Sequence, residues 1–474
     1  MTECSQPEIR FRAPGRREVV ARFDGGDISS DAGGLLLGEV DRRIGLLEGF
    51  AACFSDHRDP SRVEHGVGEL VRQRVLALAL GYEDLNDHDT LSADPLLAVL
   101  VGKRDPKGRD RRREAHRGRA LASSSTLNRL ELARPESAGD DRYKRIELDF
   151  EAVDRLLVET YLGSFEEEPE EIVLDLDATD DPLHGKQEGR FFHGYYGHYC
   201  YLPLYIFAGE HLLCARLRAS DIDGSAGALE ELKRIVGQIR ARWPSTRIVV
   251  RADSGFCRES LMAWCEQEHL DYVLGLARNE RLQAELEPWM QHARDLAEAD
   301  DGLACLFASF EWSTLSSWSR MRTVIGKAER LQGKDNPRFV VTSLACRDSR
   351  DAERIYREIY CARGDMENRI KEQQLGLFAD RTSSATMRAN QLRLYFSSFA
   401  YVLMQGLRRL GLTGTAYARA QSTTIRLKLL KIGARIRITV RKVWLSFSEA
   451  YPYANDIAQI LANLHRHPAW APPD

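Results

Sequence analysis

Several common sequence patterns are missing from this chain, and one long segment lacks acidic residues. No aspartate or glutamate occurs between positions 381 and 448, although the 474-residue chain has 71 acidic and 67 basic residues. No apolar run approaches the ~18 residues of a membrane span, so we expect no membrane segment. The nine cysteines are scattered and form no Cys-x-x-Cys pair, which argues against a zinc site and favours reduced thiols in a cytoplasm. The polar first twenty residues predict no signal peptide.

The segment without acids, residues 381–448, carries thirteen lysines and arginines. A second basic block occupies residues 103–119, and an acidic run covers 166–171. The net charge of the chain is only −4 and says little about its partners. The separation of basic and acidic residues into different segments is more informative. The blocks predict a polyanionic partner. A solvated helix face is the alternative, and it explains the block at 103–119 better than it explains the longer segment.

The apolar periodicity divides the chain into regions. Residues 1–135 repeat apolar positions at helical spacing, which predicts a mostly helical N-terminal module. Residues 149–280 and 336–448 mix buried-strand patterns with helices, which is typical of an α/β layer. Residues 281–335 change character and predict a β-rich insertion, and residues 449–474 predict a last helix and a tail.

Acidic residues follow two of the predicted buried strands. Asp175 and Asp177 close the run that begins at Glu171, and they share one strand face because strand side chains alternate. Asp253 ends the run Arg247–Ala252, and carboxylates at the ends of neighbouring strands meet at one sheet edge. A pair of carboxylates there suggests a cation site, with a turn or capping role for Asp177 as the alternative. A site that holds two divalent ions needs a third acid, and Glu367 is the candidate.

Glu367 belongs to a helical pattern in which Tyr360, Arg363 and Glu367 follow the spacing Tyr-x2-Arg-x3-Glu. Residues three, four and seven positions apart share one helix face. Taken singly, the arginine could form a surface ion pair and the tyrosine could simply pack. At this spacing before an acid, we favour functional roles for both.

This signature resembles that of the bacterial insertion-sequence DDE transposases of the IS-four-like superfamily. Asp177 stands in the Asp-x-Thr context of that family, and Asp253 stands in its Asp-Ser-Gly-Phe context. Residues 81–87, Gly-Tyr-Glu-Asp-x-Asn-Asp, also resemble one branch of the superfamily. The family signature has lysine seven residues after the glutamate, where this chain has Gln374. Lys371, one helical turn from Glu367, is the nearest substitute.

The resemblance implies an α/β fold with a ribonuclease-H-like catalytic core, interrupted by the insertion at 281–335 and preceded by a DNA-binding module. It implies that Asp177, Asp253 and Glu367 are the catalytic residues and hold two Mg²⁺ ions, for which Mn²⁺ is an expected substitute. Tyr360, Arg363 and Lys371 would then bind DNA phosphates. The role of Asp175 stays open.

The implied function is a transposase that cleaves DNA and transfers the cut strand. Its partners would be the terminal inverted repeats of the transposon and target DNA, held by a homodimer at the nucleoid in a bacterial cytoplasm. One alternative is a ribonuclease-H-like nuclease without strand transfer, and another is a catalytically idle, domesticated DNA-binding protein. A carboxylate-pair sugar hydrolase is disfavoured by the basic segment 381–448.

Overall fold

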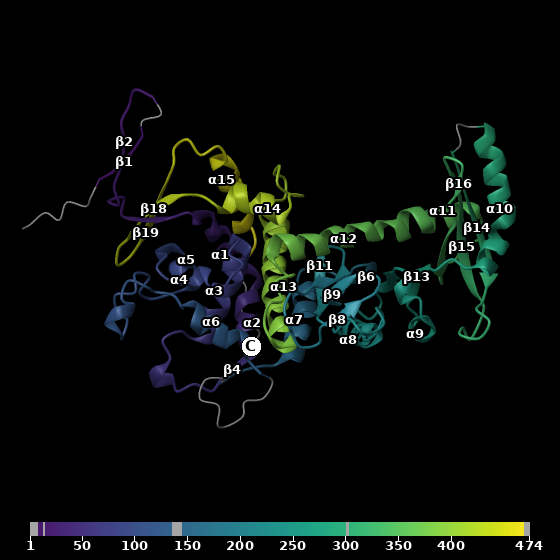
Figure 1. Ribbon diagram of the computed structural model, residues 1–474, viewed down its shortest axis with the longest axis horizontal. Helices are drawn as coiled ribbons and strands as arrows, with labels where there is room; N and C mark the ends of the chain where they lie inside the picture. Colours follow the sequence, from purple (N-terminus) through teal and green to yellow (C-terminus); the bar gives the residue numbers. More distant parts are fainter. Residues whose placement is uncertain (1–7, 13–14, 135–144, 300–302, 469–474) are drawn as a thin grey trace, which may run out of the picture. The chain divides into compact units, whose positions relative to one another are not determined.

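The computed structural model describes residues 8–12, 15–134, 145–299 and 303–468 (Figure 1). The chain forms two compact units. The helical unit comprises residues 1–149, 376–378 and 399–474. The sheet unit comprises residues 150–375 and 379–398. Helices and strands are both well represented, so the expected α/β class is confirmed.

The sheet unit is built on a nine-stranded mixed sheet. Eight strands follow the order β11-β10-β6-β12-β13-β17-β15-β14, and β16 (Lys334–Asp335) pairs with β15. Strand β6 pairs antiparallel with β10 and parallel with β12, and β12 pairs parallel with β13. The bounds of the strands are β6 (Glu171–Ala178), β10 (Leu204–Ala208), β11 (His211–Arg216), β12 (Arg247–Ala252), β13 (Asp271–Leu276), β14 (Leu303–Trp312), β15 (Arg322–Leu331) and β17 (Arg338–Thr342).

Alternating side chains of β6 lie on opposite faces of this sheet. Leu174 and Leu176 are fully buried in a core shared with four helices. These helices are α7 (Phe150–Leu162), α8 (Ala228–Arg242), α9 (Glu259–Gln267) and α10 (Glu280–Ala299). Val173 packs into a second core that contains Ile355. Asp175 and Asp177 alternate with the leucines, so they share the face of Val173.

A continuous helical run contributes Ile355 to that second face (Figure 1). It comprises α11 (Ser349–Arg354), the π-helical η5 (Ile355–Tyr360), the short η6 (Cys361–Arg363), α12 (Gly364–Lys371) and the π-helical η7 (Glu372–Gly376). Gly364 keeps helical angles, with φ −55° and ψ −23°, so it does not interrupt the run. π-Helical turns are often found at functional sites, and η5 ends at Tyr360.

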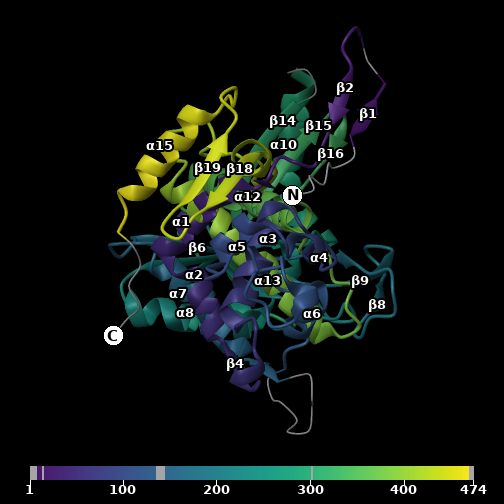
Figure 2. The same ribbon diagram turned by 90° about the vertical axis from the view of Figure 1, so that its left-hand side faces the viewer.

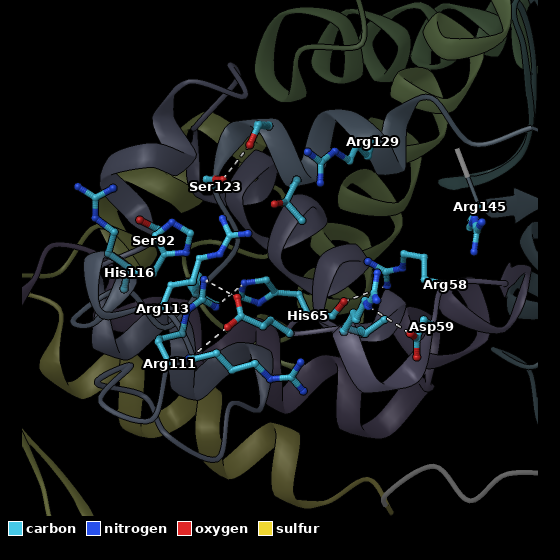
Figure 3. A pocket seen from close by; sticks show the side chains of 18 residues that line it. Arg58, Asp59, His65, Ser92, Arg111, Arg113, His116, Ser123, Arg129 and Arg145 are labelled. Atoms are coloured by element: carbon cyan, nitrogen blue, oxygen red, sulfur yellow. Dashed lines mark hydrogen bonds and ion pairs between the residues drawn. The ribbon is translucent and has the colours of Figure 1, made fainter. Parts of the chain in front are cut away.

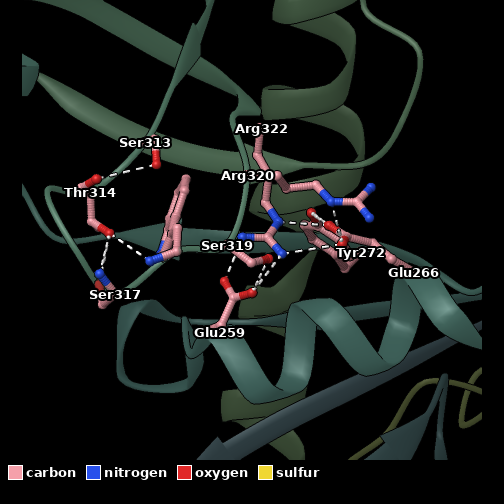
Figure 4. Close-up of polar contacts among 10 residues, drawn as sticks. Glu259, Glu266, Tyr272, Ser313, Thr314, Ser317, Ser319, Arg320 and Arg322 are labelled. Carbon is pink, nitrogen blue, oxygen red and sulfur yellow. Dashed lines mark hydrogen bonds and ion pairs between the residues drawn. The ribbon is translucent and has the colours of Figure 1, made fainter.

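The region expected as a β-rich insertion, residues 281–335, belongs to the sheet unit. It supplies most of the helix α10 and the antiparallel pair β14 and β15, and β15 joins the main sheet through β17. Figure 4 shows how Arg322 of β15 connects this pair to α9. The buried guanidinium of Arg322 lies 2.6 Å from both Glu259 and Glu266. The region is therefore a continuation of the sheet that carries its own helix.

The helical unit is organised around α3 (Val67–Leu80), whose side chains are mostly buried. The other main helices are α1 (Leu35–Ile44), α2 (Leu46–Ala52), α5 (Pro95–Val101), α6 (Ser124–Glu131) and α15 (Ala454–His465). Figure 2 shows β18 (Ala434–Ile438) and β19 (Val443–Phe447), which form a three-stranded sheet with β3 (Asp27–Ser29).

The long helix α13 (Met387–Leu410) contributes residues to both units. In the helical unit, the ring of Phe399 stacks on that of Phe50 with centroids 3.9 Å apart. Sequence reasoning placed residues 336–448 together with the catalytic core, whereas the structure groups 399–448 with the helical unit. The C-terminal half of α13 accounts for this grouping, because Phe399 packs on Phe50 of α2 and Gly406 lies against Val40 and Ile44 of α1. Among the described residues, no helix is both long and apolar enough to span a bilayer.

Candidate active site

The first predicted catalytic acid, Asp177, lies one residue before the end of β6. Its side chain is 15 % exposed, and its Oδ1 accepts a hydrogen bond from the amide of Ala178. Asp253 directly follows β12, where the register pairs Ala252 with Leu176. The parallel register therefore brings Asp253 next to Asp177. Asp253 caps a short helical turn by accepting a 2.8 Å hydrogen bond from the amide of Gly255.

The helical run brings Arg363 and Glu367 to the same edge. Arg363 Nη2 donates a 2.8 Å hydrogen bond to Glu367 Oε1. Arg363 Nη1 lies 3.7 Å from Asp177 Oδ1. The guanidinium thus contacts the first and the third predicted catalytic acids. The shared helix face predicted its nearness to Glu367, whereas its nearness to Asp177 comes from the tertiary structure.

The hydroxyl of Tyr360 lies against Gly275 of β13, near the same edge of the sheet. A β-carbon added at Gly275 would lie 2.6 Å from the Tyr360 hydroxyl and 2.8 Å from the amide nitrogen of Ser254. Only glycine lets the tyrosine and the segment after Asp253 pack this closely. Sequence reasoning missed Gly275. Its one signal is a glycine inside an apolar strand, which often marks a close approach of backbone.

Negative charge is concentrated at this edge. The pKa of Asp177 is raised to about 7, mainly by burial; nearby Arg363 opposes this rise, and the charges of Asp253 and Glu367 contribute to it. Carboxylates that raise one another's pKa are a common feature of functional sites. The guanidinium of Arg363 pairs with two of these acids, Asp177 and Glu367, and is influenced by the charge of the third, Asp253.

Asp175, whose role the sequence left open, forms a buried ion pair with Arg251 of β12. Arg251 Nη2 donates to Asp175 Oδ2 at 2.7 Å, and Nε donates to Oδ1. Arg251 Nη1 also donates to the carbonyl of Ile359, next to Tyr360. This arginine therefore joins the two acid-bearing strands and the helical run. Sequence reasoning missed it, although a charge within the run Ile-Val-Val-Arg-Ala is a visible signal.

Lys371 and Gln374 have different environments. Lys371 is exposed at the end of α12, and the described ion pair of Glu367 is with Arg363. Gln374 is half-buried, and its Nε2 donates a 3.0 Å hydrogen bond to the carbonyl of Asp180. Gln374 lies within the π-helical turn η7, so the α-helical spacing that aligned it with Glu367 does not apply there.

The predicted metal ligands fit divalent cations by their chemistry. All three are carboxylates, and oxygen ligands are those that Mg²⁺ and Mn²⁺ prefer. In the described part of the chain, no three histidine, cysteine or acidic side chains already form a metal cluster. The contacts of Arg363 with Asp177 and Glu367 show that these two acids accept a shared positive charge.

The chain matches the family model described as "Transposase DDE domain group 1" over residues 11–469. The match spans nearly the whole sequence, so the chain belongs to this family. The expected resemblance to DDE transposases is confirmed at this level. The narrower assignment to the IS-four-like branch stays a prediction.

Seven chains of solved structures also match, and one of them is described as a cryo-EM structure of the piggyBac transposase synaptic complex with hairpin DNA. This chain is 11% identical to that one in sequence, with a TM-score of 0.41. The alignment covers 94% of this chain and 87% of the other. No curated protein matches.

Proposed function

We propose that this protein is a transposase that cleaves DNA and transfers the cut strand by phosphoryl transfer. The observation that carries the proposal is that Arg363 contacts both Asp177 and Glu367 at the sheet edge where Asp253 follows the neighbouring strand. The sheet order β11-β10-β6-β12-β13 supports a ribonuclease-H-like core. In it, three antiparallel strands are followed by two strands parallel to the first.

Asp177, Asp253 and Glu367 would hold two Mg²⁺ ions, or Mn²⁺ in their place. When bound, such ions lower the pKa of water and neutralise charge that develops on phosphate oxygens. The raised pKa of Asp177 is consistent with this role: burial and, to a smaller extent, the charges of Asp253 and Glu367 raise it, and a bound cation would favour the ionised carboxylate.

The remaining side chains would bind and orient the DNA. Arg363 can present a planar pair of donors to a phosphate, which a lysine cannot do. Tyr360 would position the scissile phosphate, and Lys371 would contact the backbone one helical turn further along. The Asp175–Arg251 pair would keep the acids and the helical run in register.

Two exchanges at phosphorus complete the proposed reaction. In the first, the oxygen of water bonds to phosphorus while the bond to the 3′ oxygen breaks, which leaves a 3′-hydroxyl at the transposon end. In the second, that hydroxyl attacks a target phosphorus and displaces the 3′ oxygen of the target strand. The partners would be terminal inverted repeats and target DNA, held by a homodimer.

The test uses labelled DNA carrying the ends of the element that encodes the chain, with purified protein and Mg²⁺. We expect nicked ends and strand-transfer products from the wild type, and neither from Asp177→Asn. Glu358→Gln is the control for Glu367→Gln, because Glu358 is exposed on the same helical run. Cleavage without transfer would favour a ribonuclease-H-like nuclease instead, and binding without cleavage would favour an idle DNA-binding protein.

A further inference from the structure

The helical unit contains a cavity of about 800 Å³ that lies far along the chain from the acids of the sheet unit (Figure 3). It is lined by the segment 58–65, by the loop 111–119, by the start of α6 and by Arg145. Eight arginines face it, against two acids, Asp59 and Glu64. We call this cavity the arginine basin.

The two acids do not balance this charge. Asp59 lies 3.4 Å from Arg62, and Glu64 lies 3.3 Å from Arg111. Arg58 also pairs with Asp56, which lies 2.7 Å away outside the lining, so the excess of positive charge is smaller than the number of arginines. The exposed side chains of Arg113 and Arg119 still add positive charge to the cavity, and a bound anion would lower the repulsion between like charges.

His65 provides an independent indication of a ligand. The residue is only 5 % exposed, and its Nε2 lies 2.6 Å from Arg111 Nη1. Because a guanidinium only donates, Nε2 accepts, and the ring proton is assigned to Nδ1. This buried Nδ1 has no hydrogen-bond partner within the described chain, and Arg111 Nε has none there either. Buried donors without partners are rare in proteins and call for an acceptor.

His65 does not add to the positive charge. Burial, followed by nearby Lys103 and Arg111, lowers the pKa of His65 to about 3. The ring is therefore neutral at physiological pH, and it can donate a hydrogen bond from Nδ1. A neutral donor among arginines suits an oxyanion, which accepts hydrogen bonds and carries negative charge.

We infer that the arginine basin binds phosphate groups of a nucleic-acid backbone, at a site separate in sequence from the catalytic acids. The inference rests on the proposed function, because it takes DNA as the ligand. Guanidinium groups match phosphate geometry, and the cavity volume lies within the range of ~300–1,000 Å³ of ligand sites. Histidines are the only aromatic side chains among the described lining residues, so the basin offers no large ring on which a base could stack.

The test removes two charges from the basin and compares them with two charges removed nearby. The basin variant is Arg113→Gln with Arg119→Gln, since both side chains are exposed and line the cavity. The control is Arg109→Gln with Arg117→Gln, two exposed arginines of the same loop region outside the lining. Fluorescence anisotropy measures binding of a labelled duplex of arbitrary sequence in EDTA, so that cleavage cannot interfere.

We expect the basin variant to weaken duplex binding about tenfold or more at low salt. It should also reduce the salt slope of log Kd by about two, one for each lost phosphate contact. The control pair should change both quantities much less. Equal effects of the two pairs would overturn the inference, because they would indicate a diffuse charge effect.

A free nucleotide is the other source of phosphate, and ATP tests it. Thermal stabilisation by ATP that the basin variant loses, together with unchanged duplex binding, would overturn the assignment to a nucleic-acid backbone. The catalytic proposal is tested separately with Mg²⁺. Loss of duplex binding in the basin variant, with no cleavage by the wild type, would support the basin and refute the transposase activity. Cleavage by the wild type, together with unchanged duplex binding by the basin variant, would support the transposase activity and refute the basin as a nucleic-acid site.

Discussion

The two units concentrate charges of opposite sign, and they do so by different means. In the sheet unit, parallel register places Asp253 beside Asp177, and a helical run adds Glu367. In the helical unit, the arginine basin is formed mainly by loops and short turns. Regular elements bring acids from distant parts of the chain to one sheet edge, whereas loops collect many arginines around a cavity.

This difference matches the ligands proposed for each site. A divalent cation needs a few oxygen ligands in defined positions. A nucleic-acid backbone needs several positive charges spread along its length, and it tolerates looser placement. In both sites a buried polar atom lacks a described hydrogen-bond partner, namely Arg363 Nη1 in one and His65 Nδ1 in the other.

Removing the acids should have the largest effect. Asp177→Asn, Asp253→Asn and Glu367→Gln should each lower DNA cleavage at least about 10⁴-fold, or about 5.4 kcal/mol of barrier. Each should leave duplex binding in EDTA nearly unchanged, because binding is assigned mainly to positive charge elsewhere. Cleavage and anisotropy assays on the same preparations measure both. If binding fell along with cleavage, the separation of the two sites would be wrong.

Breaking the buried pair beneath the acids should come next. Arg251→Met leaves Asp175 buried without its partner, so the free energy of unfolding should fall by about 3–5 kcal/mol. Arg247→Met, on the same strand, should lose less than ~1 kcal/mol, because its ion pairs are exposed. Urea denaturation measures both. The double variant Arg251→Met with Asp175→Leu should regain stability without regaining cleavage. Recovery of cleavage would show that the pair does not position the site.

A smaller effect is expected at the end of α12. Lys371→Ala should slow cleavage by one to two orders of magnitude, about 1.4–2.7 kcal/mol, because a phosphate contact is lost. Gln374→Ala should matter less, since its amide is hydrogen-bonded to the carbonyl of Asp180. Single-turnover cleavage rates compare the two. A larger loss with Gln374→Ala would assign the functional position to Gln374.

The last test concerns the environment of Asp177 without metal. In EDTA at pH 8, Asp177→Asn should raise the free energy of unfolding by up to about 4 kcal/mol. The reason is that the folded-state pKa of Asp177 is raised to about 7, so its ionised form destabilises the fold. The stabilisation should be full above pH 7 and should disappear as pH falls towards the unfolded-state pKa. Thermal or urea unfolding at several pH values checks it, and a pH-independent difference would argue against this charge cluster.

Expectations based on local pattern agree best with the structure. The buried-strand runs around Asp177 and Asp253 form β6 and β12, and the segment with Tyr360, Arg363 and Glu367 is helical. These patterns depend on alternation and helical period, which are properties of adjacent residues. The catalytic roles themselves stay proposals.

The number of basic residues in a segment predicted its exposed positive charge less well. Arg426 belongs to the basic segment 381–448, yet its guanidinium donates to the carbonyls of Leu78, Ala79 and Gly376. Arg426 therefore supplies hydrogen-bond donors to carbonyls in the last turn of α3, which have no partner within the helix. Exposed members of the segment, such as Arg435 and Arg437, lie on β18.

The sequence alone determined the α/β class, the order of the acids and the spacing of the Tyr-Arg-Glu signature, because each is written in neighbouring residues. Only the tertiary structure decided that Asp175 pairs with Arg251, 76 positions away, and therefore is not free to bind a cation. It also decided that residues near 58, 111 and 145 line one arginine basin. Such contacts depend on strand register and on how distant segments pack, which a local pattern does not specify.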